Sequence, residues 1–173
     1  MKTHQWRRAS ASAAALSVLL AGSLTGCEGV VARESAGTES TCSTTGTCTV
    51  GDRGPGGGWI IHVGPPGSNL EVAPQAWAGA TEPLVTWAAA KTAATTYAGG
   101  GKADWRLPEL LELIDLYNCT FKDTIGGFDN SSFYWSSHVR RGNQDPMVVG
   151  FAKGTQMVWR ATDKANVRPV RTF

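Results

Sequence analysis

The short segment Asp104–Pro108, with the sequence DWRLP, constrains the fold most strongly, because a run of apolar residues with helical spacing follows it directly. Proline favours the first turn of a helix, where its fixed φ is already helical and its missing N–H would have no partner. The sequence therefore predicts that a helix begins at Pro108. An apolar stripe along one side of this helix is expected to face a core. Its residues are Leu107, Leu110, Leu111, Ile114 and Tyr117.

The polar residues of the same segment are expected to be structural. Asp104, Trp105 and Arg106 offer a carboxylate, an indole donor and a guanidinium at the start of the helix. There they can hydrogen-bond to loops that cross nearby. We therefore favour a structural staple over a ligand site.

Residues 1–26 have the parts of a bacterial lipoprotein signal peptide. Basic residues come first, an Ala- and Leu-rich run too short to cross a membrane follows, and small residues precede Cys27. Residues 24–27 (LTGC) resemble a lipobox, which implies cleavage before Cys27 and a diacylglycerol thioether on its sulfur. Ordinary secretory cleavage near Ala21 is the less favoured alternative. The expected location is the bacterial cell envelope, and Glu28 favours the outer membrane if there are two, since aspartate commonly retains lipoproteins at the inner membrane.

Residues 27–49 are rich in Ser, Thr, Gly and Glu, so we expect a flexible tether. Cys42 and Cys48 lie within it, and an oxidising compartment favours a small disulfide loop between them. Spacing does not determine connectivity: Cys119 could be free and buried, or could pair with either cysteine. A structural zinc site is less favoured, because neither histidine of the mature chain lies near a cysteine pair. We therefore predict no metal site.

Residues 50–173 are long enough to form one core and predict a single α+β domain. The glycine-rich run 54–58 precedes β-branched residues, so it predicts a tight turn into a strand rather than a phosphate loop. A helix is expected to start at 81–83 and to end at the glycines 99–101. The strands expected are 59–63, 133–137, 147–151, 156–160 and 167–173.

Charge is unevenly distributed along the chain. The sequence has 16 basic and 14 acidic residues, and the signal peptide holds three of the basic ones. Residues 131–173 have a net charge of +5, with Asp145 and Asp163 as their only acids. Some of these cations are expected to pair with carboxylates from earlier in the chain.

The loop 137–145 is the predicted contact site. It lies between two expected strands and is basic at its centre, and loops on a rigid scaffold commonly carry binding residues. With neighbouring turns it supplies cations that can hold sulfate or carboxylate groups. The candidate ligand residues are His138, Arg140, Arg141, Asn143 and Lys153, with Lys164 adding charge. Trp77 and Trp135 could stack on sugars, but Trp135 is more typical of a core.

Four motifs in one order carry a resemblance to a known family. They are residues 51–58 (GDRGPGGG), 104–108 with Glu112 following, 134–137 (YWSS) and 167–173 (VRPVRTF). Together they resemble the Lcl C-terminal domain family of bacterial surface and envelope modules, one of which is carried by a collagen-like adhesin. The chain departs from the family at Glu109, where Ser or Thr is usual, so we expect a poorly capped helix.

The resemblance implies a C-type-lectin-like fold, with two helices packed on a mostly antiparallel sheet and the first and last strands paired. Those strands would be 59–63 and 167–173. Arg168 and Arg171 are expected to pair with Asp104 or Glu112 inside the domain. The residues expected to be structural are Asp104, Trp105, Arg106, Glu112, Trp135, Arg168 and Arg171.

An enzyme is not predicted. The chain has no nucleophile-elbow pattern, and an oxidase like the formylglycine-generating enzymes, the least favoured reading, needs a cysteine pair where Cys119 stands alone. Calcium is also less favoured, because the Trp-Asn-Asp and Glu-Pro-Asn patterns of C-type lectins are absent, so no cofactor is expected. Oxygen ligands near one another in sequence are Asp123, Asp129, Asn130, Asn143 and Asp145.

The favoured function is an envelope-anchored lipoprotein that presents a lectin-like binding or adhesion domain. The adhesin relative implied by the resemblance binds sulfated polysaccharide, so polyanionic glycans are the favoured ligand class. A structural or protein-binding envelope module without glycan affinity is the alternative. The expected partners are the membrane, through the lipid anchor, and a glycan or protein ligand at the cell surface, with no nucleic acid.

Overall fold

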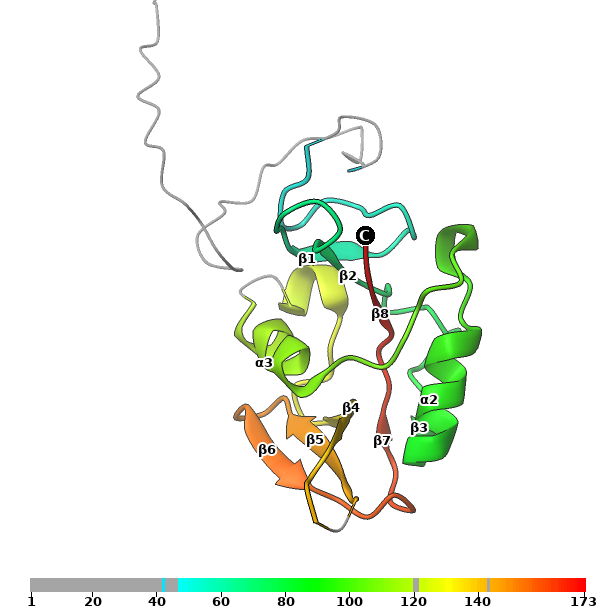
Figure 1. The fold of residues 1–173 in the computed structure, drawn as a ribbon, viewed down its shortest axis with the longest axis vertical. Coiled ribbons are helices and arrows are strands. Elements are labelled where there is room, and N and C mark those ends of the chain that lie inside the picture. The colour runs from blue at the N-terminus through cyan, green and yellow to red at the C-terminus, as the bar shows by residue number, and fades with distance from the viewer. Residues whose placement is uncertain (1–41, 43–46, 120–121, 143) are drawn as a thin grey trace, which may run out of the picture.

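Two β-sheets form the framework of the structure, a computed structural model in which residues 42, 47–119, 122–142 and 144–173 are described (Figure 1). The first sheet has the strand order β1-β2-β8, and the second has the order β3-β7-β4-β5-β6. The parallel pairing of β4 with β7 interrupts otherwise antiparallel sheets. The strands are β1 (Trp59–His62), β2 (Leu70–Val72), β3 (Leu84–Val85), β4 (Phe133–Val139), β5 (Pro146–Gly150), β6 (Thr155–Val158), β7 (Ala165–Asn166) and β8 (Val170–Thr172).

Two α-helices, α2 (Trp87–Thr96) and α3 (Leu110–Asn118), lie on either side of the strands β7 and β8 in Figure 1. A short 3-10 turn, η1 (Gly99–Gly101), follows α2, and a π-helical turn, η2 (Lys122–Gly126), follows α3. The predicted α+β class is confirmed.

The two helices cover opposite faces of the second sheet. Neighbouring residues of a strand point to opposite faces, and Tyr134 and Trp135 of β4 belong to different core clusters. Tyr134 packs with Leu113 and Leu116 of α3, whereas Trp135 packs with the small residues of α2. The fold therefore has one core under each helix.

The first and last strands share a sheet but are not neighbours. β2 lies between them and pairs antiparallel with both β1 and β8. The direct pairing of 59–63 with 167–173 is therefore wrong. The sequence did not predict β2, because this strand has only three residues, Leu70–Val72, and prolines flank it on both sides as they would in a loop.

The start of α3 differs from the prediction by two residues. Pro108 precedes the helix, and Glu109 takes the N-cap position with an extended backbone. The Glu112 carboxylate accepts the backbone N–H of Glu109 at 2.7 Å, which is one half of a capping box. The weak N-terminus expected from Glu109 is therefore not observed, because Glu112 does the capping from inside the helix.

The buried side of α3 also differs from the predicted stripe. Leu113 and Leu116 are fully buried, whereas Leu111 is 70% exposed. Successive helical residues rotate by about 100°, so Leu111 lies almost opposite Leu113. The predicted core position of Leu111 is wrong, although Leu110, Ile114 and Tyr117 do pack partly against the core.

The predicted helix from 81 to 99 begins later, because Leu84 and Val85 form strand β3 against β7. Trp87 is then the first residue of α2, and Tyr97 is its C-cap. Proline at position 83 suits the entrance to an edge strand as well as a helix start, so the sequence alone did not separate the two.

A disulfide joins Cys42 to Cys48, as predicted, with their Cα atoms 4.7 Å apart. The alternatives in which Cys119 pairs with either residue are therefore excluded. Cys119 is buried at the C-terminal end of α3.

The burial pattern of α3 gives a direct test of the core. Leu113→Ala is expected to lower the free energy of unfolding by about 2–5 kcal/mol, because it leaves a cavity between α3 and the second sheet. Leu111→Ala, its matched control on the exposed side, is expected to change it by about 0.5 kcal/mol or less. Urea denaturation followed by circular dichroism measures both, and equal losses in the two variants would contradict the assignment.

Candidate functional site

A buried carboxylate, Glu71 on β2, ties together three distant parts of the chain. Its side chain is fully buried and accepts hydrogen bonds from the backbone N–H groups of Gly56 and Gly58, at 3.0 and 2.7 Å. Arg171 on β8 donates to the same carboxylate at 2.9 Å. A Cβ on Gly58 would lie 2.2 Å from the carbonyl oxygen of Val72, so the glycine-rich turn is needed for this close approach.

Arg171 also joins this buried site to the surface. It donates to both oxygens of Asp104, at 2.7 and 2.9 Å. The neighbouring Trp105 is buried, and its indole N–H bonds to the carbonyl of Gly99. These contacts leave Arg171 with two carboxylate partners inside the domain.

The predicted pairing of Arg168 with Asp104 or Glu112 is wrong. Arg168 pairs with Glu82 instead. It is fully buried, bonds to the carbonyl of Gly126, and lies with its guanidinium carbon 4.2 Å from the centre of the Phe128 ring. Burial raises the pKa of Glu82, against the opposing effect of Arg168. Glu82 also accepts a hydrogen bond from the Tyr134 hydroxyl at 2.6 Å.

Glu112 binds Arg106 instead of a C-terminal arginine. The two side chains form a bidentate pair, with both N···O distances 2.7 Å. Trp135 is fully buried and donates its indole N–H to the carbonyl of Val85. The Trp135 ring is therefore not available to a sugar.

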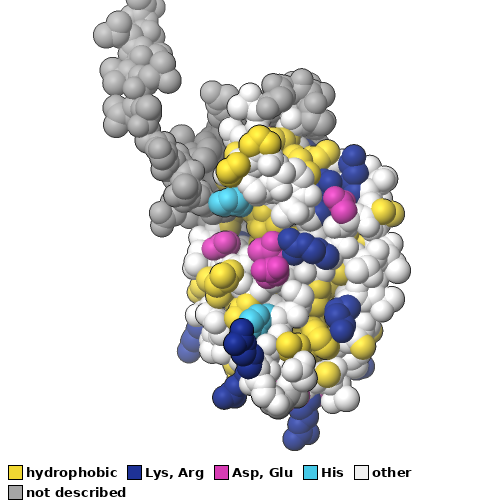
Figure 2. Space-filling view, viewed as in Figure 1, with side chains coloured by type: hydrophobic (Ala, Val, Ile, Leu, Met, Phe, Trp, Pro, Cys, Tyr) yellow, Lys and Arg dark blue, Asp and Glu magenta, His cyan; other side chains and the backbone are white. Residues whose placement is uncertain are grey.

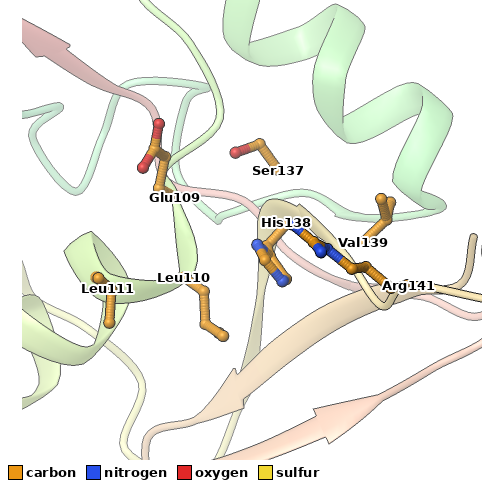
Figure 3. Close-up of a pocket in the computed structure, with 7 residues that line it drawn as sticks. All are labelled: Glu109, Leu110, Leu111, Ser137, His138, Val139 and Arg141. Atoms are coloured by element: carbon orange, nitrogen blue, oxygen red, sulfur yellow. The ribbon is translucent and has the colours of Figure 1, made fainter.

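Two of the predicted ligand residues, His138 and Arg141, line an open hollow of about 690 Å³. Figure 3 shows His138 and Arg141 on one side of this hollow and the first residues of α3 on the other. Leu110 and the exposed Leu111 give it an apolar wall. The backbone N–H of Ser137 donates to the carbonyl of Pro108 at 2.7 Å, which holds β4 against the start of α3.

The other predicted ligand residues are spread over the sheet. Arg140 is exposed at the end of the β4–β5 hairpin, where its backbone N–H bonds to the carbonyl of Asp145. Lys153 lies in the β5–β6 turn, at the opposite end of β5, so its predicted place in a turn neighbouring Arg140 and Arg141 is wrong. Asn143 lies outside the described residues.

The structure brings two other cations to the hairpin end. β6 runs back along β5, and the backbone N–H of Trp159 bonds to the carbonyl of Pro146. Arg160 and Lys164, both exposed, follow in the next turn. We call Arg140, Arg141, Arg160 and Lys164 the basic end. Figure 2 shows Lys and Arg side chains gathered at this lower end of the molecule.

Arg160 was not among the predicted ligand residues, because its position near Arg140 depends on strand direction, which composition does not reveal. The acids nearby are Asp145 and Asp163, and Asp163 accepts the backbone N–H of Arg160 at 3.1 Å. Adjacent strands are about 4.8 Å apart, so Arg140 and Arg160, separated by β5, have backbones roughly 10 Å apart. This spacing suits an extended ligand with repeated negative groups.

The oxygen-bearing residues considered for calcium are engaged with one another. Asn130 donates to Asp123 at 2.9 Å, and Asp129 accepts hydrogen bonds from Ser131 and Ser132. These bonds hold the pKa of Asp129 below its ordinary value. Within the described ranges, no group of three or more His, Cys, Asp or Glu residues could hold a metal ion.

The fold and this surface define an α+β domain with internally paired arginines and a separate exposed basic end. The sequence model of the Lcl C-terminal domain family matches residues 49–171. The chain belongs to the Lcl C-terminal domain family, a family of bacterial surface-associated domains. No curated protein matches the chain. Among the described residues, no helix is long and apolar enough to cross a membrane.

The contact between Arg171 and Asp104 predicts a pH-dependent contribution to stability. Arg171 holds the pKa of Asp104 below its ordinary value of 3.8, mainly through its hydrogen bonds. Because the folded pKa is the lower one, the stabilisation is present above about pH 4 and is lost as the pH falls through the folded pKa.

Asp104→Asn is therefore expected to lower the free energy of unfolding by about 1 kcal/mol at pH 7, a modest value because this side chain is half exposed. The difference from the wild type should shrink below about pH 4. Urea titrations at several pH values measure it, with the exposed Asp115→Asn as the control. A difference that stayed constant with pH would contradict the ion pair.

Proposed function

We propose that this protein is an envelope-anchored lipoprotein whose folded domain binds polyanionic glycans through the basic end. The observation that carries the proposal is the separation of the arginines into two sets. Arg106, Arg168 and Arg171 bind carboxylates inside the domain. The basic end is exposed instead, and its guanidinium groups can bind sulfate or carboxylate in a bidentate manner.

The position of the first described residues, away from the basic end, supports display of the basic end. In Figure 1 the first described residues lie at the top, beside the first sheet, and the β4–β5 hairpin lies at the bottom. A tether that starts at Cys27 would therefore join the domain at the end away from the basic end. Several such domains on one membrane would gain avidity for a long glycan, even if each binds weakly.

The hollow supports the second candidate, a protein-binding module. Its wall combines Leu110 and exposed Leu111 with His138 and Arg141, which is the mixture typical of a peptide-binding cleft. This candidate predicts binding that depends on Leu111 and changes little with salt.

The anchoring part of the proposal rests on residues 24–27 (LTGC). Cells grown with labelled palmitate are expected to incorporate the label into the wild-type protein and not into the Cys27→Ser variant. Precipitation of the protein followed by gel fluorography measures this incorporation. Equal labelling of both proteins would contradict lipid attachment at Cys27.

The glycan part is tested on immobilised heparin with the mature protein in non-ionic detergent. Retention is expected at low salt and should decrease steeply towards physiological salt, because exposed charges are screened. The double variant Arg140→Ala/Arg141→Ala should elute at clearly lower salt than the wild type, and Lys153→Ala, on the opposite turn, should elute with it.

Two outcomes oppose this part of the proposal. Absence of retention at low salt would exclude polyanion binding. A shift for Lys153→Ala of about half that of the double variant, which removes two charges instead of one, would mean that net charge alone determines retention, rather than the basic end.

A further inference from the structure

The indole N–H groups of the described tryptophans fall into two sets. Four of them donate to backbone carbonyls inside the domain, at 2.8–3.1 Å. These tryptophans are Trp77, Trp87, Trp105 and Trp135. Buried or half-buried indoles usually find such a partner, so the two remaining tryptophans call for an explanation.

Trp59 is one of the two, and its ring is covered. The guanidinium carbon of Arg53 lies 3.6 Å from the centre of the Trp59 ring. That contact is a cation–π interaction, and the guanidinium covers one face of the ring. Trp59 therefore has no open aromatic surface on this side.

Trp159 differs from Trp59 in its surroundings. As for Trp59, no described residue accepts a hydrogen bond from its indole N–H, and the indole nitrogen is accessible to solvent. The ring is half-buried and held in place by Phe133, at 4.7 Å between centroids, and by Trp135, at 6.1 Å and perpendicular. The domain thus fixes the orientation of this indole without using its donor.

The surroundings of Trp159 combine apolar surface with positive charge. Met157, two residues earlier on the edge strand β6, is 41% exposed and lies opposite the buried Val148. Trp159 directly follows β6, and its backbone N–H continues the pairing to Pro146 of β5, so alternation puts Met157 and Trp159 on the same face. The next residue, Arg160, belongs to the basic end, and the Trp159 backbone is bonded to Pro146 at that end.

We propose that Trp159, with Met157 and Phe133 beside it, is a stacking platform for one sugar ring of an anionic polysaccharide. The apolar face of a pyranose would lie on the indole, and a hydroxyl would accept the open N–H. Arg160 and its neighbours in the basic end would hold the charged substituents of the flanking sugars. This inference rests on the proposed glycan binding, and it makes sugar rings, rather than negative charge alone, part of what is recognised.

A membrane surface fits these residues less well. Interfacial insertion requires several apolar side chains that project together from the surface. Here Phe133 and Trp159 are half-buried, and Met157 is the single strongly exposed member of the group. A fixed, half-buried ring with an open donor suits a small flat ligand better.

The test compares two polyanions on the mature protein in non-ionic detergent. Heparin oligosaccharides contain sugar rings, and poly(vinyl sulfate) carries sulfates without them. Trp159→Leu is expected to weaken heparin binding by roughly three- to tenfold, as expected for the loss of one aromatic contact, and to leave poly(vinyl sulfate) binding unchanged. Trp159→Phe, which keeps a ring but loses the donor, should give an intermediate affinity for heparin.

The outcomes separate the platform from the proposed function. Equal weakening for both polyanions, or none, overturns the platform while polyanion binding stands. Absence of heparin binding by the wild-type protein overturns the proposed function and the platform with it. Loss of binding to vesicles of anionic phospholipid in Trp159→Leu, with heparin affinity unchanged, would assign Trp159 to the membrane instead.

A measurement on the wild type keeps the test independent of the stability of the variants. The indole N–H signal of Trp159, assigned by its loss in Trp159→Phe, is expected to shift in a nitrogen–proton correlation spectrum when heparin oligosaccharide is added. The signals of Trp77 and Trp87, whose N–H groups are bonded internally, serve as controls. A Trp159 signal that does not move at saturating oligosaccharide overturns the platform.

Discussion

The contact between Arg171 and Glu71 is the interaction on which the rest of the structure depends. Removing two charges from water is costly, and the cost is recovered only when each charge has several well-placed partners. Glu71 meets this condition through two backbone N–H groups as well as Arg171, and Arg171 through Asp104 as well as Glu71. The glycine-rich turn, β2, β8 and the segment before α3 must therefore all be in place together.

The same condition explains why the C-terminal arginines and the glycines occur as motifs. Gly56 and Gly58 bring their N–H groups to Glu71 because no Cβ stands in the way. Arg168 makes an equivalent junction elsewhere, between Glu82, Phe128 and the carbonyl of Gly126. Two buried arginines thus join the first half of the domain to the last strands.

The sequence predicted local features well and long-range ones poorly. Short motifs were enough to predict the α+β class, the tight glycine turn, the buried Trp135 and the Cys42–Cys48 disulfide. The errors lie where a choice depends on a distant partner. Glu82 could not be identified as the partner of Arg168, because nothing in its own neighbourhood marks it as buried. Leu111 was assigned to the core because several leucines share its spacing, and only packing shows which side of α3 is covered.

If the proposed lipid anchor holds the chain, the position of the basic end, away from the first described residues, determines what it can contact. Bacterial membranes carry anionic lipids, whose field attracts nearby Lys and Arg side chains and fades within a Debye length, about 8 Å at physiological salt. A basic surface next to the tether would be held by the protein's own membrane. In the proposed lipoprotein, the basic end lies at the far end of the domain from the first described residues (Figure 1), so its cations would be removed from that competition. The fold would then direct this charge away from the lipid and towards whatever surrounds the cell.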